Sequence, residues 1–432
     1  MRIYCLGGAG KICREAVYDL AVFSGADEIV VGDYNEDEAA RVADKAGSLA
    51  GDSAQSPQAG ASGQAGSSAG ASGQADSSGG AGTGSVKPAA KIRAEFIDVT
   101  DVGAAAAKLR GYDVVMDGTQ ISMNGRSTEC IAKAGVSGVN LNGFGAEDEW
   151  AEHFADAGAV CVPGFGMTPG VTQMMAMAAA AEMDAVHEIY VSHGAFRPIA
   201  FSPSIAETTR VEYQPDHPSR LVYEDGEFIH VPPFARPKEI ALPEPYGNTT
   251  QYIIPHSETL TLPKALAEKG LRLVEVRGTW PRQNMDLVRG LYGYGILENP
   301  AVKVGGAEAG LMDIIADYLL STEAGRTTAL YGYALHVEAC GEKDGKKITV
   351  TYTHTHPASD GSVPEWAGLR AYTKNVGIPM AIAAAMIAKG EILRDPKTGA
   401  PRKGLLTPEE AFDPQTVFGE LARRGMVVRR TG

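Results

Sequence analysis

The 432-residue sequence has few cysteines, an excess of negative over positive charge, and no long apolar run, and each feature excludes a class of protein. The five cysteines form no CxxC pair, are too few for a disulfide scaffold, and favour a reducing compartment. Asp and Glu outnumber Lys and Arg by 53 to 39, a formal charge of −14. Phosphate backbones repel such a chain, and it has no basic tract suited to a membrane surface.

No run of about twenty apolar residues is present to cross a bilayer. The first residues also do not fit a signal peptide, because a short apolar stretch runs directly into glycines and a charged amphipathic segment. We therefore expect a cytoplasmic protein that binds neither nucleic acid nor membrane.

Residues 50–85 lack Val, Ile, Leu, Met and aromatic side chains altogether. The segment is mostly Gly, Ala, Ser and Gln, with an imperfect repeat, GASGQAGSSA followed by GASGQADSSG. It buries too little apolar area to offset its ordering entropy, which predicts a flexible Gly/Ala/Ser insertion over 48–90. It falls between a helix and a strand, at the amino edge of the predicted sheet. Since ligands bind at the opposite edge, deleting 50–85 is expected to leave catalytic constants almost unchanged.

The rest of the N-terminal third alternates short apolar strands with amphipathic helices. Strands are expected at 2–6, 28–31, 93–97, 113–116 and 136–141, and helices at 11–23, 36–46, 104–109 and 127–134. This alternation is typical of an α/β protein with a Rossmann doubly wound parallel sheet, and it predicts a dinucleotide-binding domain over 1–145.

From about residue 184 the pattern changes to strand-like runs without tight β–α alternation. Turn signals such as EDGE (224–227) and EKDGKK (342–347) predict antiparallel hairpins. We assign 146–374 to a second, α+β domain with a mixed or antiparallel sheet, which is expected to bind substrate.

Residues 7–13, GGAGKIC, stand where a Gly-x-Gly-x-x-Gly dinucleotide turn belongs, after a strand and before a helix. Gly8 and Gly10 fill the first two glycine positions. Cys13 fills the third, which packs helix against strand and does not touch phosphate. Asp33 ends the second strand, at the place of a carboxylate that accepts hydrogen bonds from ribose hydroxyls. Because Tyr34 and no arginine follows it, the sequence favours NAD over NADP.

Two later strand ends, FIDVTD (96–101) and MDGTQ (116–120), are expected at the same edge, beside the adenine and the nicotinamide. The candidate cofactor-binding residues are Gly8, Gly10, Lys11, Ile12, Asp33, Tyr34, Asp98, Val99, Gly118, Thr119 and Gln120.

Polar residues suited to substrate chemistry gather in three later stretches. PHSETLTLP (255–263) contains His256 and Glu258, the candidate catalytic residues, because an imidazole near neutrality can take the proton of an ammonium group. PSIAETTRVEY (203–213) offers a guanidinium for a carboxylate and a carboxylate for an ammonium. The loop 163–175 runs into a helix whose N-terminus suits a carboxylate. The candidate substrate-binding residues are Arg210, Glu207, Thr168, Ser257 and Thr259.

Bland alternatives stay open for these residues. His256 can instead satisfy the backbone of its loop, and Arg210 can belong to a surface ion pair. His354 and His356 share one face of a predicted strand but have no visible third ligand, so no metal site is predicted.

Several motifs together resemble the saccharopine dehydrogenase family. They are GGAGKIC, GFGMTPGVT (164–172), PEPYGNTTQYIIPHSETLTLP (243–263), GIPMAIAAAMIAKGEI (377–392) and GLLTPEEAFDP (404–414). The run 221–247 is most like the lysine 6-dehydrogenase branch.

The resemblance implies an NAD(P)-dependent oxidoreductase acting on a C–N bond of an amino acid, favoured as an NAD-dependent dehydrogenase that deaminates lysine or a similar diamino acid. It also implies C-terminal helices (375–432) that return to the Rossmann domain, and a homodimer formed through the sheet of the second domain (146–374). Two alternatives stay open: a reductive, imine-forming enzyme of the saccharopine or carboxynorspermidine type, and a non-catalytic NAD-binding sensor.

Overall fold

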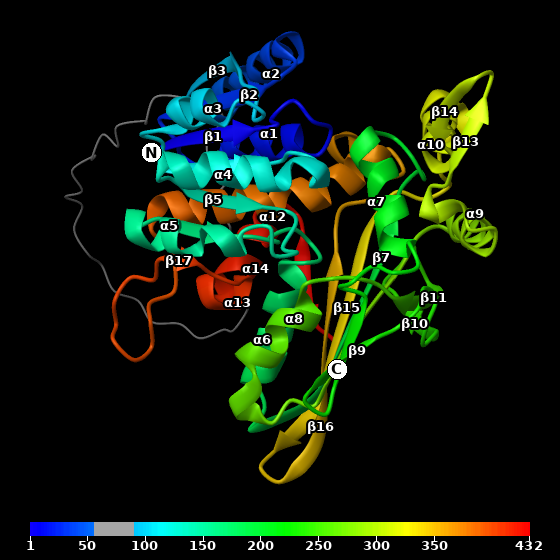
Figure 1. Ribbon diagram of the computed structural model, residues 1–432. Helices are drawn as coiled ribbons and strands as arrows, with labels where there is room; N and C mark the ends of the chain where they lie inside the picture. The colour runs from blue at the N-terminus through cyan, green and yellow to red at the C-terminus, as the bar shows by residue number, and fades with distance from the viewer. Residues whose placement is uncertain (56–89) are drawn as a thin grey trace, which may run out of the picture.

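The computed structural model describes residues 1–55 and 90–432, and two β-sheets organise it (Figure 1). Within these residues the first sheet has seven strands, all parallel, in the order β17-β6-β5-β4-β1-β2-β3. They are β1 (Arg2–Leu6), β2 (Glu28–Asp33), β3 (Lys91–Phe96), β4 (Val114–Asp117), β5 (Ser137–Asn140), β6 (Val160–Val162) and β17 (Gly404–Leu405). The expected doubly wound parallel sheet is confirmed, and its strands continue past residue 145, where we placed the end of the first domain.

Helices cover both faces of this sheet, as a parallel sheet with two apolar faces requires. Strand β1 shows the alternation, because Ile3 and Cys5 pack in one apolar cluster and Tyr4 and Leu6 in another. One face carries α1 (Cys13–Phe23), α2 (Glu36–Gln55) and α12 (Leu369–Lys389). The other carries α3 (Val102–Leu109), α4 (Asn124–Ala134) and α5 (Ala151–Ala157).

The second sheet is mixed, because β7 and β12 pair in parallel while its other pairs are antiparallel. Its order is β10-β11-β12-β7-β15-β16-β18, and the β8–β9 hairpin joins it through β12. The strands are β7 (Ala185–Phe196), β8 (Leu221–Glu224), β9 (Glu227–His230), β10 (Lys238–Ala241), β11 (Asn248–Ile253), β12 (Leu273–Thr279), β15 (Gly332–Lys343), β16 (Lys346–Thr355) and β18 (Val427–Arg430). Both predicted turns are present, joining β8 to β9 and β15 to β16.

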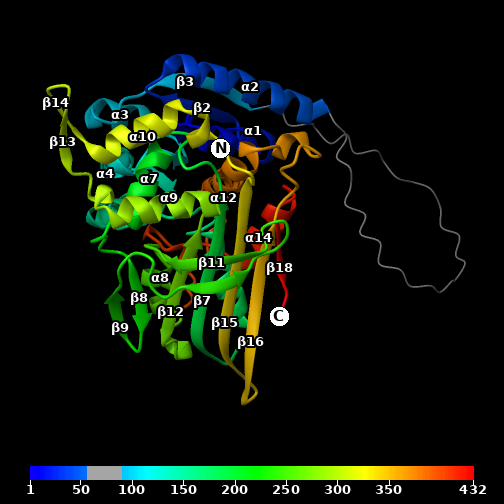
Figure 2. The same ribbon diagram turned by 90° about the vertical axis from the view of Figure 1, so that its right-hand side faces the viewer.

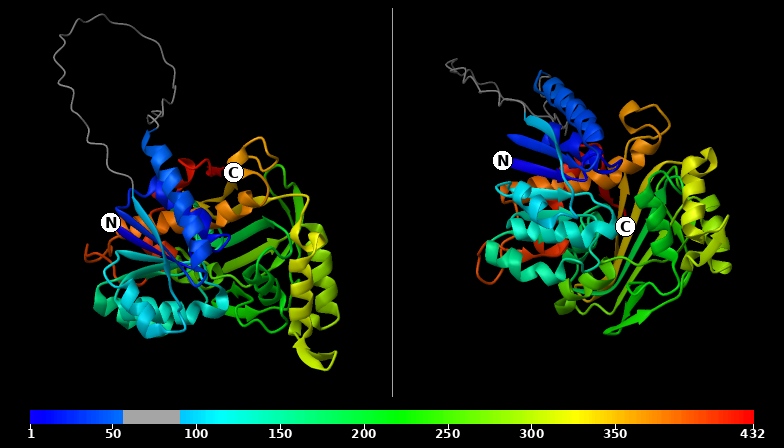
Figure 3. Two further views of the ribbon diagram at one scale, coloured as in Figure 1. Left: turned by 90° about the horizontal axis from the view of Figure 1, so that it is seen from above. Right: turned by 45° about the horizontal axis from the view of Figure 1, so that its top comes forward.

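Helix α12 lies between the two sheets and connects the halves of the molecule (Figure 3). It contacts α1, β4 and β5 on one side and β15 on the other, and its central turns are almost entirely buried. The C-terminal segment therefore does return to the Rossmann domain. It contributes more than helices, however, because β17 extends the first sheet and β18 pairs with β16 of the second.

The remaining helices complete the second half of the molecule. The α12 side of its sheet also carries α6 (Val171–Ala181), α8 (Glu258–Ala265), α13 (Pro408–Ala411) and α14 (Pro414–Ala422). At the end of that sheet nearest the first sheet lie α7 (Pro203–Tyr213), α9 (Arg282–Gly293), α10 (Leu311–Ser321), α11 (Glu323–Arg326) and the hairpin of β13 (Ala301–Val304) and β14 (Ala307–Gly310) (Figure 2). None of the helices formed by residues 1–55 and 90–432 is long and apolar enough to cross a membrane.

One expectation about the insertion is wrong. We predicted a flexible segment from residue 48, but α2 runs on to Gln55. The reason is a stripe of small apolar residues at helical spacing, in which Ala39, Val42, Ala46 and Ala50 are all buried. The rest of the predicted insertion, 56–89, lies outside the described residues.

Deleting the repeat at 60–79 is expected to leave both stability and catalytic constants unchanged. Strand β3, which follows the insertion, pairs Lys91 with Glu28 at the amino-terminal start of β2, the edge opposite the strand ends that carry Asp33 and Asp117. Comparing urea midpoints and kcat/KM of the deletion variant with those of the full chain tests this. A large loss of turnover in a variant that still unfolds at the normal midpoint would refute it.

Candidate active site

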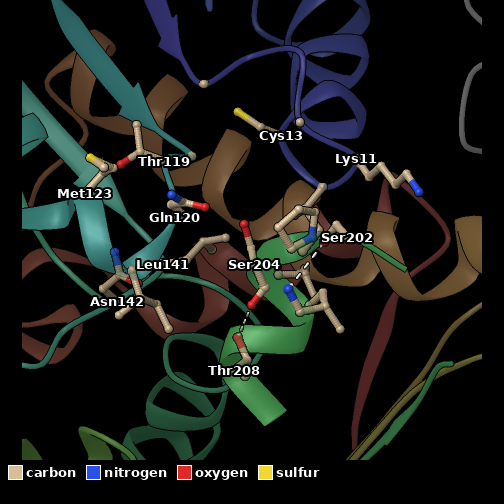
Figure 4. Close-up of a pocket in the computed structure, with 18 of the residues that line it drawn as sticks. Lys11, Cys13, Thr119, Gln120, Met123, Leu141, Asn142, Ser202, Ser204 and Thr208 are labelled. Atoms are coloured by element: carbon tan, nitrogen blue, oxygen red, sulfur yellow. Dashed lines mark hydrogen bonds between the residues drawn. The ribbon is translucent and has the colours of Figure 1, made fainter. Parts of the chain in front are cut away.

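A cavity of about 1090 Å³ lies where the carboxyl ends of the first sheet meet α7 and loops of the second half. Figure 4 shows Gln120 and Asn142, from loops of the first sheet, facing Ser204 and Thr208 of α7 across this space. Because both halves of the chain line the cavity, a single ligand can contact both.

The glycine turn keeps its close approach to the sheet despite Cys13. This cysteine is buried at the first position of α1. It packs against Gly118, where an added Cβ would lie 2.6 Å from the Cys13 sulfur. The small residue that the contact needs therefore stands on the strand side instead of the helix side. Gly10, Lys11 and Ile12 line the cavity, whereas Gly8, the first predicted fingerprint glycine, is buried and does not line it.

Asp33 lies at the end of β2, on the cavity wall. One of its carboxylate oxygens accepts a hydrogen bond of 3.1 Å from the amide of Ala9 in the glycine turn, and the other accepts one of 3.0 Å from the amide of Asn35. Tyr34 is 80% exposed and also lines the cavity. The carboxylate is thereby fixed against the turn, where it can meet a hydroxyl-bearing ligand.

The two later strand ends reach the same cavity. Asp98 and Val99 follow β3, and Gly118, Thr119 and Gln120 follow β4, and all five line it.

A buried polar network behind β5 was not found from the sequence. Oε1 of Glu147 accepts hydrogen bonds of 2.8 Å from Asn124 and 2.6 Å from Asn140. The side-chain oxygen of Asn140 in turn accepts from the amides of Asn142 and Gly164, at 2.9 and 3.2 Å. This network fixes the loop that carries Asn142 to the cavity wall. The available signal was the asparagine that ends β5, a polar residue where an apolar strand stops.

His256 lies on the cavity wall, and Glu258 lies behind it in the first turn of α8. Nδ1 of His256 is 3.4 Å from Oε2 of Glu258 and 3.2 Å from Oγ1 of Thr168. Thr168 and Thr172 each donate a hydrogen bond of 2.6 Å to Oε1 of Glu258. Since Nδ1 faces the carboxylate, Nε2 is the nitrogen that remains for a ligand.

The pair is polarised by its surroundings. Burial opposes the charged form of His256, but the charge and hydrogen bond of Glu258, with the charge of Glu212, outweigh it and raise the pKa of His256. Burial likewise opposes ionisation of Glu258, but His256 and the two threonine hydroxyls hold the pKa of Glu258 below its usual value. The neighbouring His193, 5.4 Å away between ring centroids, has its pKa lowered by burial to about 3 and is neutral.

The other substrate candidates lie in different places. Thr168 lines the cavity, whereas Ser257, Thr259, Glu207 and Arg210 do not. Ser257 and Thr259 are buried around the start of α8. Glu207 accepts a hydrogen bond from the backbone of Ser122, and burial raises the pKa of Glu207.

The cavity face of α7 instead presents Ser204, Thr208, Val211 and Glu212. Glu212 was missed by the sequence reasoning. The sequence signal for Glu212 is the spacing of polar residues at 204, 208 and 212, which places them on one face of the helix. This polar face lies next to the buried face, which ends at Tyr213. Burial raises the pKa of Glu212, although the charges of His256, Arg197 and Arg220 oppose the rise.

Cations gather at the glycine-turn end of the cavity, where Lys11, Arg14 and Arg326 line the wall. Lys11 donates a hydrogen bond to the carbonyl oxygen of Phe201, and Arg14 lies 3.9 Å from a carboxylate oxygen of Glu38. Burial, followed by the charges of Arg14 and Arg326, lowers the pKa of Lys11.

In the part of the chain that the structure describes, no three His, Cys, Asp or Glu side chains are placed to hold a metal ion. The nitrogens of His356 are occupied otherwise, since Nε2 lies 2.7 Å from the hydroxyl of Tyr246 and Nδ1 lies 2.7 Å from the carbonyl oxygen of Pro357. His354 is fully buried.

Comparison with known proteins gives the family. Residues 166–426, more than half of the chain, match the model of the saccharopine dehydrogenase C-terminal domain. The chain belongs to the saccharopine dehydrogenase family. This confirms the resemblance inferred from the motifs, while the lysine 6-dehydrogenase branch stays a prediction.

One solved structure shares the fold of this chain over its whole length. An apo, histidine-tagged saccharopine dehydrogenase (L-Glu forming) from Saccharomyces cerevisiae is 15% identical, with a TM-score of 0.66 and coverage of 100% of both chains. An engineered D-amino acid dehydrogenase bound to NADP+ is 14% identical, with a TM-score of 0.40 over 98% of this chain and 99% of that one. The Corynebacterium glutamicum DAP dehydrogenase in complex with DAP is 13% identical, with a TM-score of 0.39 over 98% of both.

Proposed function

We propose that the protein is a nicotinamide-dependent oxidoreductase that acts on a C–N bond of an amino acid, favoured as the oxidative deamination of lysine or a similar diamino acid with NAD. One observation carries the proposal: a single cavity joins the glycine turn and Asp33 to the His256–Glu258 pair. The family membership of the chain supports it. A dehydrogenase needs one continuous cavity, because the nicotinamide end of the dinucleotide must lie against the reacting carbon of the substrate while its adenosine ribose lies at the glycine turn.

The residues present fit a dinucleotide. The glycine turn opens α1, whose N-terminus suits a diphosphate, and Lys11 and Arg326 add positive charge at the same end of the cavity. Asp33 suits the hydroxyls of a ribose. A 2′-phosphate would meet this carboxylate, and the nearby Arg14 already lies against Glu38, which supports NAD as the preferred cofactor. Gly118, Thr119 and Gln120 would hold the nicotinamide half, which supplies a hydride acceptor.

The substrate chemistry follows from His256. Oxidation of an amine requires a neutral nitrogen, so the ammonium proton must first leave. Nε2 of His256 takes that proton, and Glu258 stabilises the imidazolium through Nδ1. Transfer of hydride from the carbon to a bound nicotinamide would leave an iminium group, and water would convert this group to a carbonyl compound and an ammonium ion. Thr168, bonded to both members of the pair, orients the imidazole.

Asp33→Ala is expected to raise the dissociation constant for NADH about tenfold to a hundredfold, the value of one or two charge-assisted hydrogen bonds. The affinity for NADPH should fall less, because the lost carboxylate no longer repels its phosphate. Fluorescence titration of both dinucleotides measures this. Asp37→Ala, at an exposed position in α2 outside the cavity, is the matched control. Equal losses for NADH and NADPH would contradict the ribose contact.

The function itself is tested by nicotinamide reduction at mildly alkaline pH with lysine, ornithine, other diamino acids and saccharopine, each with NAD and NADP. Reduction of NAD by lysine supports the deaminating branch. Oxidation of NADH only when an amine and a keto acid or aldehyde are supplied together would assign the imine-forming reaction instead. Tight NADH binding without turnover on any substrate would favour the sensor.

A further inference from the structure

Glu212 is a carboxylate that faces the cavity without a partner. It stands on the cavity face of α7, together with Ser204 and Thr208. Among the described residues no side chain donates a hydrogen bond to its carboxylate, and the groups that influence it, led by His256, Arg197 and Arg220, act through their charges alone. An ionised carboxylate that gives up bulk water at a cavity wall is stabilised by a bound cation.

The cationic side chains of residues 1–55 and 90–432 do not supply that partner at the cavity surface. Among the described residues, Lys11, Arg14 and Arg326 line the cavity, and they belong to its glycine-turn end.

Arg197 is one alternative partner, but it is only 1% exposed and does not line the cavity. Its Nη1 donates hydrogen bonds of 3.0 and 3.3 Å to the carbonyl oxygens of Pro198 and Ile199. Its guanidinium lies 4.7 Å from the ring centroid of Trp280 and 5.8 Å from that of Tyr372. Arg197 thus contributes positive electrostatic potential near Glu212, but its guanidinium is not accessible to a ligand in the cavity.

We propose that Glu212 binds a positively charged amino group of the substrate, so that the substrate class of this cavity is a cationic amine, namely a diamine or diamino acid, and not a dicarboxylate. This deepens the proposed function and rests on it for the reaction. His256 takes the proton of the reacting nitrogen, and Glu212 holds the second amino group, which stays protonated. Because His256 and Glu212 both line the cavity, they would distinguish the amino group that is oxidised from the amino group that holds the substrate in place.

The test uses simple ligands that differ only in charge. Thermal shift and calorimetry of the full-length protein are run with 1,5-diaminopentane, pentane-1,5-diol and glutarate at matched ionic strength, with and without NADH. The diamine should bind and stabilise the wild-type protein, while the diol and glutarate should not. Glu212→Gln should weaken diamine binding about tenfold or more, the value of a charge-assisted hydrogen bond.

Glu207→Gln is the matched control, because Glu207 is a glutamate of the same helix outside the cavity. It should keep the wild-type affinity for the diamine. Equal effects of both substitutions, or glutarate binding as well as the diamine, would overturn the proposal.

The thermal-shift and binding measurements need no turnover, so a failure of the cation site can be distinguished from a failure of the proposed dehydrogenase function. Failure of the wild-type protein to bind NADH would refute the dehydrogenase while leaving the cation site measurable. Where lysine is turned over, Glu212→Gln should raise KM for lysine more than it lowers kcat. A fall in kcat at unchanged KM would contradict an anchoring role.

Discussion

His256→Gln is expected to lower kcat/KM about a hundredfold to ten-thousandfold, the range that a positioned general base contributes. Nε2 of His256 is the nitrogen available to the cavity, and no other imidazole of the described chain lines it. The measurement is steady-state turnover of the substrate identified by the amine panel, together with the affinity for NADH. That affinity should stay within a few-fold, because the glycine turn and Asp33 are untouched.

Glu258→Gln tests the same pair through pH. In the proposed mechanism the neutral form of His256 takes the ammonium proton, so kcat/KM is expected to rise with pH as this residue loses its proton. Glu258 raises the pKa of His256, which places that rise above the pH of an ordinary imidazole. Without the carboxylate of Glu258, only the charge of Glu212 still opposes the effect of burial on the pKa of His256, so the rise moves to lower pH. The plateau falls because the base is weaker.

His193→Gln is the control for packing effects in this region. Its ring lies 5.4 Å from that of His256, stacks on Tyr333, and does not line the cavity. We expect His193→Gln to lose less turnover than His256→Gln, and to keep the pH dependence of kcat/KM of the wild-type protein. If the pH dependence of kcat/KM in Glu258→Gln were also the same as in the wild type, the His256–Glu258 pair would not act as the general base.

The sequence was sufficient to predict that the candidate cofactor-binding residues, except Gly8, line one cavity, because each of them is placed by the backbone. A turn, a strand end and an acidic residue at fixed spacing reach one edge of a parallel sheet whatever the side chains beyond them do. Lys11, Asp33, Asp98 and Gln120 therefore all reach the cavity.

The substrate half was less accessible because it depends on which face a helix turns inward. The stretch 203–213 was singled out without a secondary-structure prediction, and Glu207 and Arg210 were chosen for their chemistry alone. Only the packing of Tyr213 and its stripe against the core shows that Glu212 faces the cavity. The Glu147 network was missed for a related reason, since it joins residues from three separate segments.

Gly118→Ala is expected to destabilise the protein by about 1–3 kcal/mol, the usual cost of overpacking a close contact. The new methyl group would lie 2.6 Å from the sulfur and 2.7 Å from the Cβ of Cys13, and neither atom can move far, because Cys13 is buried at the start of α1. The displaced helix would carry the glycine turn with it, so NADH binding should weaken in parallel. Urea unfolding and fluorescence titration measure the two effects.

The decisive variant is the double substitution Cys13→Gly with Gly118→Ala, which moves the small residue from the strand back to the helix. If the contact needs only one small partner, the double variant recovers most of the stability that Gly118→Ala loses, and the two changes are strongly non-additive. Gly125→Ala is the control, because an added Cβ there meets nothing within 4 Å and should be neutral or stabilising. Additive losses in the double variant would mean that the backbone of the cavity wall requires Gly118, independently of Cys13. In that case Gly118 would not compensate for the glycine that the fingerprint lacks at position 13.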